Sequence, residues 1–111
     1  KSNDKPNSWI CLDFKEFRVS PTKYTIGTTN NSYKMKSWAV EGSNDNNEWK
    51  ILDSQKDCRL TRQNDAVLVF STSNSESEKF RYIRYRLTGL NWSNNYHIRL
   101  NSFEIYGKLF K

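Results

Sequence analysis

The fold is decided by residues 38–49, which read WAVEGSNDNNEW. In the first half of this stretch, Trp38 and Val40 alternate with small or polar residues, which is the period-two pattern of a half-buried β-strand. The four Asn and Asp residues at 44–47 favour a tight turn, because their side chains hydrogen-bond to nearby backbone and tolerate left-handed conformations. Trp49 then begins a second alternating run. The stretch therefore predicts a β-hairpin with a tryptophan on each arm.

Outward from this hairpin, the chain consists of short alternating runs separated by polar turns. The predicted strands, besides the hairpin at 36–53, are 9–14, 17–26, 66–71, 80–87 and 98–106. Pro21 indicates an edge or a bulge in its strand, and the broken alternation after Leu100 predicts a bulge near Asn101 and Ser102. No segment shows sustained helical periodicity. Turn signals every ~8–12 residues are typical of a β-sandwich or barrel.

The bulk properties indicate one domain with an aromatic core. The chain has 111 residues, and although only 35% of them are hydrophobic, 14% are aromatic. Aromatic side chains bury large areas, so they can supply the core. No run approaches the ~20 apolar residues of a membrane span. The net charge of +6 suggests a nucleic-acid partner, but none of the helix, zinc or RNA-binding signatures is present, so we expect no nucleic acid.

The sequence offers little for catalysis, and we expect no enzyme, no catalytic residue, no metal and no cofactor. His97 is the only histidine, so a His-based metal cluster cannot form from this chain. No glycine-rich phosphate loop occurs. Cys11 and Cys58 lack metal-like spacing and are expected to be two unpaired thiols in a reducing compartment. Asp13 and Arg84 lie on the non-core faces of neighbouring strands, so we predict an ion pair between them.

Three blocks carry a resemblance to a known family. They are WICLDF at 9–14, the hairpin at 38–49, and the pair FRYIR at 80–84 with FEIYG at 103–107. In this order and spacing they resemble the coagulation-factor V/VIII C-type domains, also called discoidin domains. The resemblance implies an all-β fold, an antiparallel jelly-roll β-sandwich of the galactose-binding-like type. It covers residues 9–107, with 1–8 as a loop or truncated N-terminal segment and 108–111 as a C-terminal tail.

Two departures from that family bear on location. Members carry a further segment before the strand that corresponds to 9–14, and secreted members close with a cysteine where this chain has Lys108 after Gly107. The resemblance therefore points to the intracellular branch, with a cytoplasmic location that includes association with the cytoskeleton as one alternative. The Asn- and Lys-rich composition is similar to that of protist proteins.

The candidate binding site is a pair of polar loops. Strands 17–26 and 80–87 can run the same way, so the loops that follow them emerge together; by resemblance, the first is a ligand-gripping loop of the family. The candidate residues are Thr28, Thr29, Asn30, Asn31, Tyr33, Asn91, Trp92, Asn94, Asn95 and Tyr96. Aromatic planes with side-chain amides suit a sugar or a protein. Trp92 has two interpretations, either exposed for binding or folded back to plug the sandwich.

These observations predict a non-catalytic binding module. The leading interpretation is attachment to another protein within a larger intracellular assembly or scaffold. The alternative is a carbohydrate-binding module. Binding to an anionic membrane is less favoured, because the first loop carries Thr, Asn and Ser at its tip rather than apolar side chains.

Overall fold

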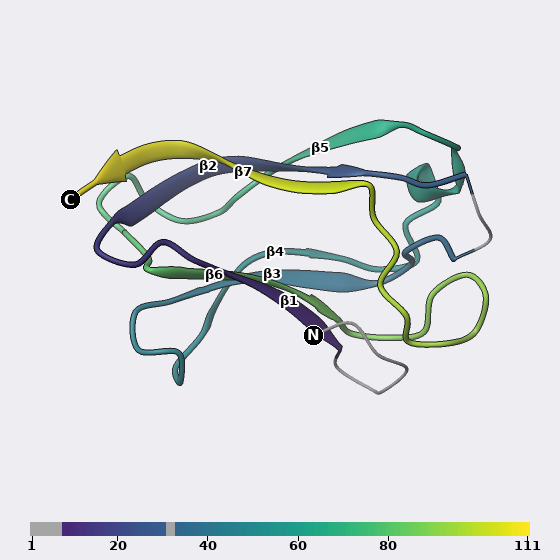
Figure 1. The fold of residues 1–111 in the computed structure, drawn as a ribbon, viewed down its shortest axis with the longest axis horizontal. Helices are drawn as coiled ribbons and strands as arrows, with labels where there is room; N and C mark the ends of the chain where they lie inside the picture. The colour runs from purple at the N-terminus through teal and green to yellow at the C-terminus, as the bar shows by residue number, and fades with distance from the viewer. Residues whose placement is uncertain (1–7, 31–32) are drawn as a thin grey trace.

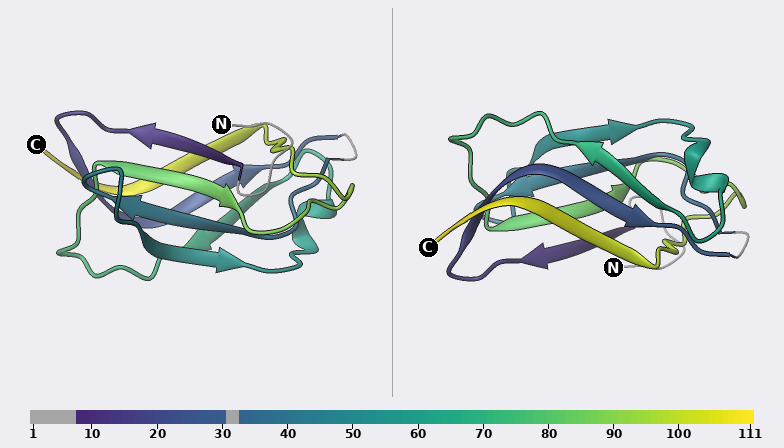
Figure 2. Two further views of the ribbon diagram at one scale, coloured as in Figure 1. Left: turned by 90° about the horizontal axis from the view of Figure 1, so that it is seen from below. Right: turned by 90° about the horizontal axis from the view of Figure 1, so that it is seen from above.

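The computed structural model describes residues 8–30 and 33–111, and it contains two antiparallel β-sheets packed face to face (Figure 1). One sheet has the strand order β1-β6-β3-β4, formed by Trp9–Asp13, Tyr82–Leu87, Trp38–Ser43 and Lys50–Gln55. The other has the order β5-β2-β7, formed by Val67–Ser71, Arg18–Gly27 and Ser102–Phe110. Figure 2 shows the strands of the two layers from both sides. The predicted all-β sandwich is confirmed.

The hairpin predicted from residues 38–49 is present as β3 and β4, which pair antiparallel. The Asp45 carboxylate closes its turn by accepting hydrogen bonds from the backbone N–H groups of Asn47 (2.9 Å) and Glu48 (2.8 Å). Asn46 takes a left-handed conformation with φ 59°, as expected for a turn residue of this kind. Trp38 is fully buried, whereas Trp49 lies half-buried on the outer face of its sheet.

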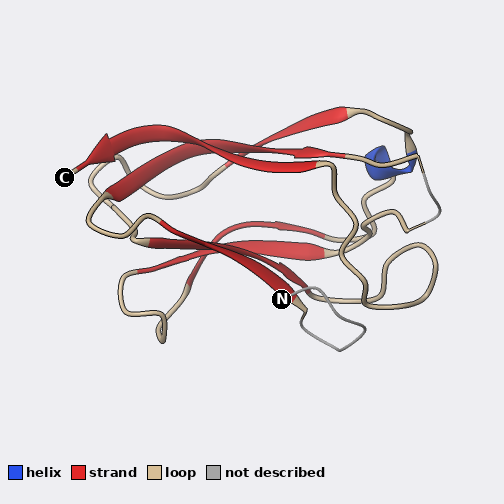
Figure 3. Cartoon of the chain, viewed as in Figure 1, coloured by secondary structure: helices blue, strands red, loops and turns tan. Residues whose placement is uncertain are grey.

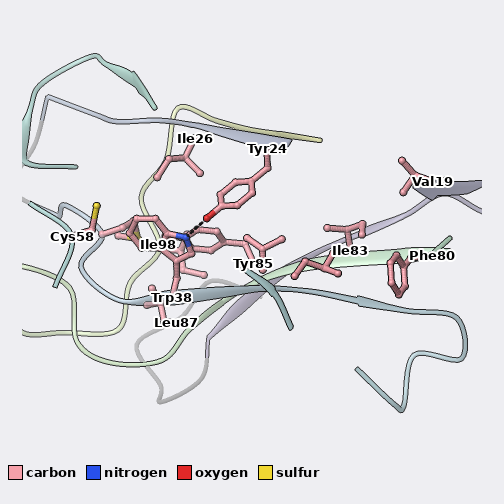
Figure 4. Packing of buried hydrophobic residues seen from close by; sticks show 13 residues of the cluster. Val19, Tyr24, Ile26, Trp38, Cys58, Phe80, Ile83, Tyr85, Leu87 and Ile98 are labelled. Carbon is pink, nitrogen blue, oxygen red and sulfur yellow. Dashed lines mark hydrogen bonds between the residues drawn. The ribbon is translucent and has the colours of Figure 1, made fainter. Parts of the chain in front are cut away.

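Aromatic rings from both sheets fill the core, as the composition predicts (Figure 4). Trp38 stacks on Tyr85 with ring centroids 5.6 Å apart, and Tyr24 stacks on Phe70 at 5.2 Å. A hydrogen-bond chain crosses between the sheets. The Trp38 indole Nε1 donates to the Tyr24 hydroxyl (2.9 Å), which donates to the Asp53 carboxylate (2.6 Å). Burial, assisted by the Asp53 hydrogen bond, raises the pKa of Tyr24 well above its usual value.

Of the two predicted strand bulges, the structure contains one and lacks the other. The β2–β7 register shifts between Pro21 and Lys23, so the bulge indicated by Pro21 is confirmed. The bulge predicted near Asn101 and Ser102 is wrong, because Ser102 begins β7 and pairs in register with Gly27. The last strand also runs further than predicted. It extends into the residues assigned to a tail, where Phe110 pairs with the first residue of β2.

The predicted ion pair between Asp13 and Arg84 is wrong. Asp13 instead accepts hydrogen bonds from Arg81, with Nε–Oδ1 at 2.9 Å and Nη2–Oδ2 at 3.2 Å. The reason is register, because β1 pairs with β6 so that Cys11, not Asp13, lies opposite Arg84. The Arg84 side chain turns to the other neighbouring strand and donates to Glu41 at 2.7 Å.

The sandwich has two different ends. One end, which we call the loop end, is formed by the β2–β3, β4–β5 and β6–β7 connections, at residues 28–37, 56–66 and 88–101. We call turn end the opposite one, formed by the connections at 14–17, 44–49 and 72–81. The single helical turn η1, Leu60–Arg62, lies at the loop end (Figure 3). The C-terminus lies at the turn end (Figure 1).

Candidate functional site

The two loops singled out in the sequence do lie together at the loop end. β2 and β6 both run toward this end, so the segments that follow them meet. The Trp92 backbone N–H donates to the Lys34 carbonyl (2.9 Å), and the Tyr33 and His97 rings meet edge to face at 5.8 Å. The β4–β5 connection joins them, because the Cys58 N–H donates to the Lys36 carbonyl (2.8 Å). Three connections therefore build one surface.

A buried lysine ties two of these connections together. Lys34 is only 8% exposed, and its Nζ donates to the Thr29 carbonyl, the Gln63 carbonyl (3.2 Å) and the Asn64 Oδ1 (2.8 Å). Three oxygen acceptors satisfy the three donors of the ammonium group. Lys34 therefore fixes the β2–β3 connection against the β4–β5 connection.

Two of the predicted binding residues are buried and structural. The Thr28 hydroxyl donates to the Gln63 carbonyl (2.7 Å) and accepts from the Ala66 N–H (2.8 Å). The Asn91 amide donates to the Asn95 Oδ1 (2.7 Å), and its oxygen accepts from the Ser93 N–H (2.9 Å). With 3% and 0% of their surfaces exposed, Thr28 and Asn91 shape the loops from inside. Neither presents its side chain to a ligand.

The other predicted residues divide by exposure. Asn30 and Asn94 are exposed at the loop end, whereas Tyr96 packs against the core. Thr29, Tyr33, Trp92 and Asn95 are half-buried. The Asn95 amide oxygen is taken up inside its own loop. Asn31 lies outside the described residues.

The Trp92 side chain is neither fully exposed nor folded back as a plug between the sheets, because it is half-buried. Its indole Nε1 donates to the Cys58 carbonyl (3.1 Å), so the ring is anchored across the β4–β5 connection rather than inserted between the sheets. Three cations lie over the ring, with Lys36 Nζ 4.6 Å, Arg62 Cζ 5.1 Å and Arg59 Cζ 5.6 Å from the ring centroid. These are distances at which cation–π attraction acts. We call these four residues the Trp92 cluster.

A groove adjoins this cluster at the ends of β3, β4 and β6. Its volume is about 420 Å³. Lys36 belongs both to the groove and to the Trp92 cluster, so the two form one continuous surface. The other lining residues are Ser37, Ser54, Gln55, Lys56, Asp57, Thr88, Gly89 and Leu90. Most of the lining residues carry hydroxyl, amide or charged groups.

Sequence reasoning missed the cations of this surface. The sequence predicts no strand between residues 53 and 66, and it does not connect Arg59 and Arg62 with Trp92, which lies some thirty positions further along the chain. A signal was present, because Arg59 and Arg62 are spaced by three residues around a short apolar–polar pair. The same spacing places both side chains on one face of a 3₁₀ turn. Only the meeting of the three connections, however, brings the ring to that face.

Among residues 8–30 and 33–111, no three His, Cys, Asp or Glu side chains gather closely enough to hold a metal ion. Over the same residues, no helix has the length and apolar character needed to traverse a bilayer.

The β-sandwich has the galactose-binding-like fold. Similar solved structures include the CBM62 module of Clostridium thermocellum Xyl5A (TM-score 0.71, 17% identity, covering 96% of this chain and 72% of that one). They also include the CBM32 module CpGH89CBM32-6 of Clostridium perfringens (TM-score 0.68, 16% identity, covering 96% of this chain and 73% of that one). A third is the C-terminal domain of a chitobiase from Bacteroides fragilis (TM-score 0.71, 19% identity, covering 97% of this chain and 68% of that one). At these identities the likeness establishes the fold.

A family model identifies the chain more specifically. The model of the Sad1/UNC-like C-terminal family matches residues 2–109, and the chain belongs to this family. The fold implied by the resemblance to factor V/VIII C-type domains is therefore confirmed, whereas membership of that particular family is not. No curated protein matches the sequence as a relative.

Proposed function

We propose that this domain is a non-catalytic binding module that attaches to another protein through its loop end. The observation that carries the proposal is the surface built there by three connections. It presents Trp92, Tyr33, Arg59 and Arg62 beside Leu60, which is 55% exposed. Trp, Tyr and Arg are the side chains that contribute most to binding energy at protein interfaces.

The rigidity of the loop end also supports attachment. Lys34, Thr28 and Asn91 hold the connections by buried hydrogen bonds before any partner arrives. A surface that is already ordered loses less conformational entropy on binding than a flexible one. The family and the carbohydrate-binding modules with the same fold are consistent with a binding role.

Site-specific photo-crosslinking in the full-length protein tests this proposal. A benzophenone side chain at Asn94, exposed at the loop end, is expected to capture a discrete protein in cells. The same group at Ser77, exposed at the turn end, serves as the matched control and is expected to capture none. Capture from Ser77 alone would move the interface to the turn end, and capture from neither position would contradict protein attachment.

Carbohydrate binding is the second candidate, because of the groove beside the Trp92 cluster. Its hydroxyl and amide lining suits the hydroxyl groups of a sugar. Two of the solved structures with this fold are CBM modules. A glycan array is expected to show binding that is lost in Gln55→Ala, which lines the groove, and in Trp92→Ala. The absence of binding to every glycan on the array would reject this candidate.

We also propose a cytoplasmic location. Cys11 and Cys58 are both free thiols, which fits a reducing compartment. Fluorescence microscopy of the tagged full-length protein tests this, and accumulation in the secretory pathway would contradict it.

A further inference from the structure

The Trp92 cluster is a fixed arrangement of positive charge. The Trp92 ring is held by hydrogen bonds from its backbone N–H to the Lys34 carbonyl and from its indole N–H to the Cys58 carbonyl. Arg59 and Arg62 flank Thr61, whose hydroxyl donates to the Met35 and Cys58 carbonyls inside the fold. The indole and the turn that carries the guanidinium groups are therefore both anchored.

The positive charges of Arg59 and Arg62 are not paired with acidic side chains of the described residues. Within residues 8–30 and 33–111, neither Arg59 nor Arg62 forms an ion pair with an acidic side chain, and both are exposed. Lys36 has one weak pair, with Asp57 at 3.9 Å. Cation–π contact with Trp92 orients the guanidinium groups without neutralising them. An incoming anion therefore meets preoriented, uncompensated donors.

The loop-end connections carry an excess of positive charge, with six Lys and Arg residues against two Asp residues. The cations are Lys34, Lys36, Lys56, Arg59, Arg62 and Arg99, and the acids are Asp57 and Asp65. Such an excess of one sign attracts an anionic partner to this surface.

The surroundings of the arginines favour a carboxylate-bearing peptide. An arginine guanidinium binds carboxylates and phosphates alike through paired, parallel hydrogen bonds, so the choice depends on what lies beside it. Leu60, 55% exposed between the two arginines, offers an apolar contact for a neighbouring side chain of the same peptide. The cluster is compact rather than a track along a surface, unlike the grooves that follow a nucleic-acid backbone.

We propose that the Trp92 cluster, with Lys56 in the adjoining groove, binds an acidic peptide segment of the partner protein. The proposal rests on the proposed function, since it specifies the chemistry of the protein that the loop end recognises. The side chains of Arg59 and Arg62 grip the carboxylates. Lys36 and Lys56 extend the site along the groove.

Fluorescence anisotropy with a labelled dodecapeptide of alternating Glu and Leu tests the proposal. We expect saturable binding that weakens as salt is raised, and no binding of the same peptide with Gln in place of Glu. The double variant Arg59→Gln/Arg62→Gln is expected to weaken binding at least about tenfold, as for loss of charge-assisted hydrogen bonds. In wild-type protein, the peptide is expected to shift the ¹⁵N–¹H resonance of the Trp92 indole.

The matched control removes the same charge from the other end. Lys79 and Lys108 also lie over an aromatic ring, that of Phe110, at 4.2 and 6.0 Å. Lys79→Gln/Lys108→Gln is expected to keep peptide affinity within about twofold of wild type, as for charges beyond a Debye length from the site. Equal losses in both double variants would show a general charge effect and overturn the site. Thermal melts of both variants confirm that they are folded.

Other outcomes would replace the acidic peptide by another occupant. Tighter binding of a heparin oligosaccharide or a single-stranded RNA, with the same dependence on Arg59 and Arg62, overturns the peptide. Concentration-dependent self-association that the arginine variant abolishes assigns the surface to a second copy of this chain. Crosslinking from Asn94 that survives in the arginine variant would leave protein attachment standing and reject acidic recognition. Absence of any peptide binding likewise rejects it.

Discussion

At the scale of single residues, two core tyrosines have hydroxyl groups in opposite situations. The Tyr24 hydroxyl links the Trp38 indole to the Asp53 carboxylate. The Tyr85 hydroxyl is buried and has no hydrogen-bond partner among the described residues. A buried polar group without a partner destabilises the folded state, whereas a paired one does not.

Replacing each tyrosine by phenylalanine should therefore change stability in opposite directions. We expect Tyr85→Phe to raise the free energy of unfolding by about 1 kcal/mol. We expect Tyr24→Phe to lower it by about 2 kcal/mol, because it leaves the Trp38 N–H and the Asp53 carboxylate without their shared partner. Urea denaturation measures both. A loss of stability in Tyr85→Phe as large as that in Tyr24→Phe would contradict this interpretation.

Glu41 is a charged residue on the outer face of its sheet, covered by two arginines. It is 4% exposed and accepts hydrogen bonds from Arg84 (2.7 Å) and Arg86 (2.9 Å). Burial would raise the pKa of Glu41, but the hydrogen bonds and charges of Arg86 and Arg84 outweigh it, so the pKa lies below its usual value. A carboxyl group with a lowered pKa in the folded state contributes stability above its unfolded pKa of about 4.3.

The Glu41→Gln variant tests this contribution and its pH dependence. At neutral pH we expect it to lose about 2–3 kcal/mol, because two partly buried arginines lose their counter-charge. The contribution disappears as the pH falls through the lowered pKa of Glu41, so the difference between the two proteins should shrink in acid. Urea titrations at neutral pH and at about pH 3 measure it, the latter below the unfolded pKa. A difference of equal size at both pH values would assign the loss to packing.

At the scale of elements, the β2–β7 pair depends on a close backbone approach at Gly107. A Cβ placed there would lie 2.2 Å from the Ser20 carbonyl oxygen and 2.7 Å from the Pro21 Cα. Both contacts are to backbone beside the bulge in β2, which cannot move aside cheaply. This gives a physical reason for the glycine that ends the FEIYG block.

Gly107→Ala should therefore destabilise the domain, by about 2–3 kcal/mol, as for other substitutions that overfill packed sites. Gly89→Ala is the matched control, because its Cβ would meet only the Ser37 Cβ at 3.7 Å, an ordinary contact. Thermal unfolding of the two variants compares them. Similar melting temperatures for both would show that β2 yields at the bulge.

The elements also show how far the sequence could be interpreted by itself. Alternation predicted the hairpin and the inward faces of β1 and β6, because period-two patterning is local. Asp13 was paired with the wrong arginine, because register depends on how distant strands align. At the loop end, the shared direction of β2 and β6 correctly predicted that the connections following them lie together. The roles of Thr28 and Asn91 were not predictable, because the amides and hydroxyls that would bind a ligand are the same groups that close a loop from inside.

At the scale of the whole molecule, protection against opening is expected to follow sheet position. β2, β3 and β6 have a neighbour on both sides, whereas β1, β4, β5 and β7 are edges. β2 is itself divided, because β5 pairs only with Lys23–Gly27, and on that side the first half of the strand has only an isolated bridge from Val19 to Phe80 and one bond from the Thr72 N–H to the Thr22 carbonyl. Amides that open only in global unfolding belong to the central, doubly paired segments.

Hydrogen exchange followed by NMR tests this order. The slowest amides are expected in β3, β6 and the second half of β2, with faster exchange at Arg18 and Ser20, which belong to the less fully paired first half of the same strand. Because the connections at the loop end are held by buried hydrogen bonds, the Trp92 and Cys58 amides should also exchange slowly for loop positions. Rapid exchange of these two amides would show that the loop end opens separately from the sheets. The surface proposed for binding would then be assembled only with its partner, and the entropic argument for a preformed site would fail.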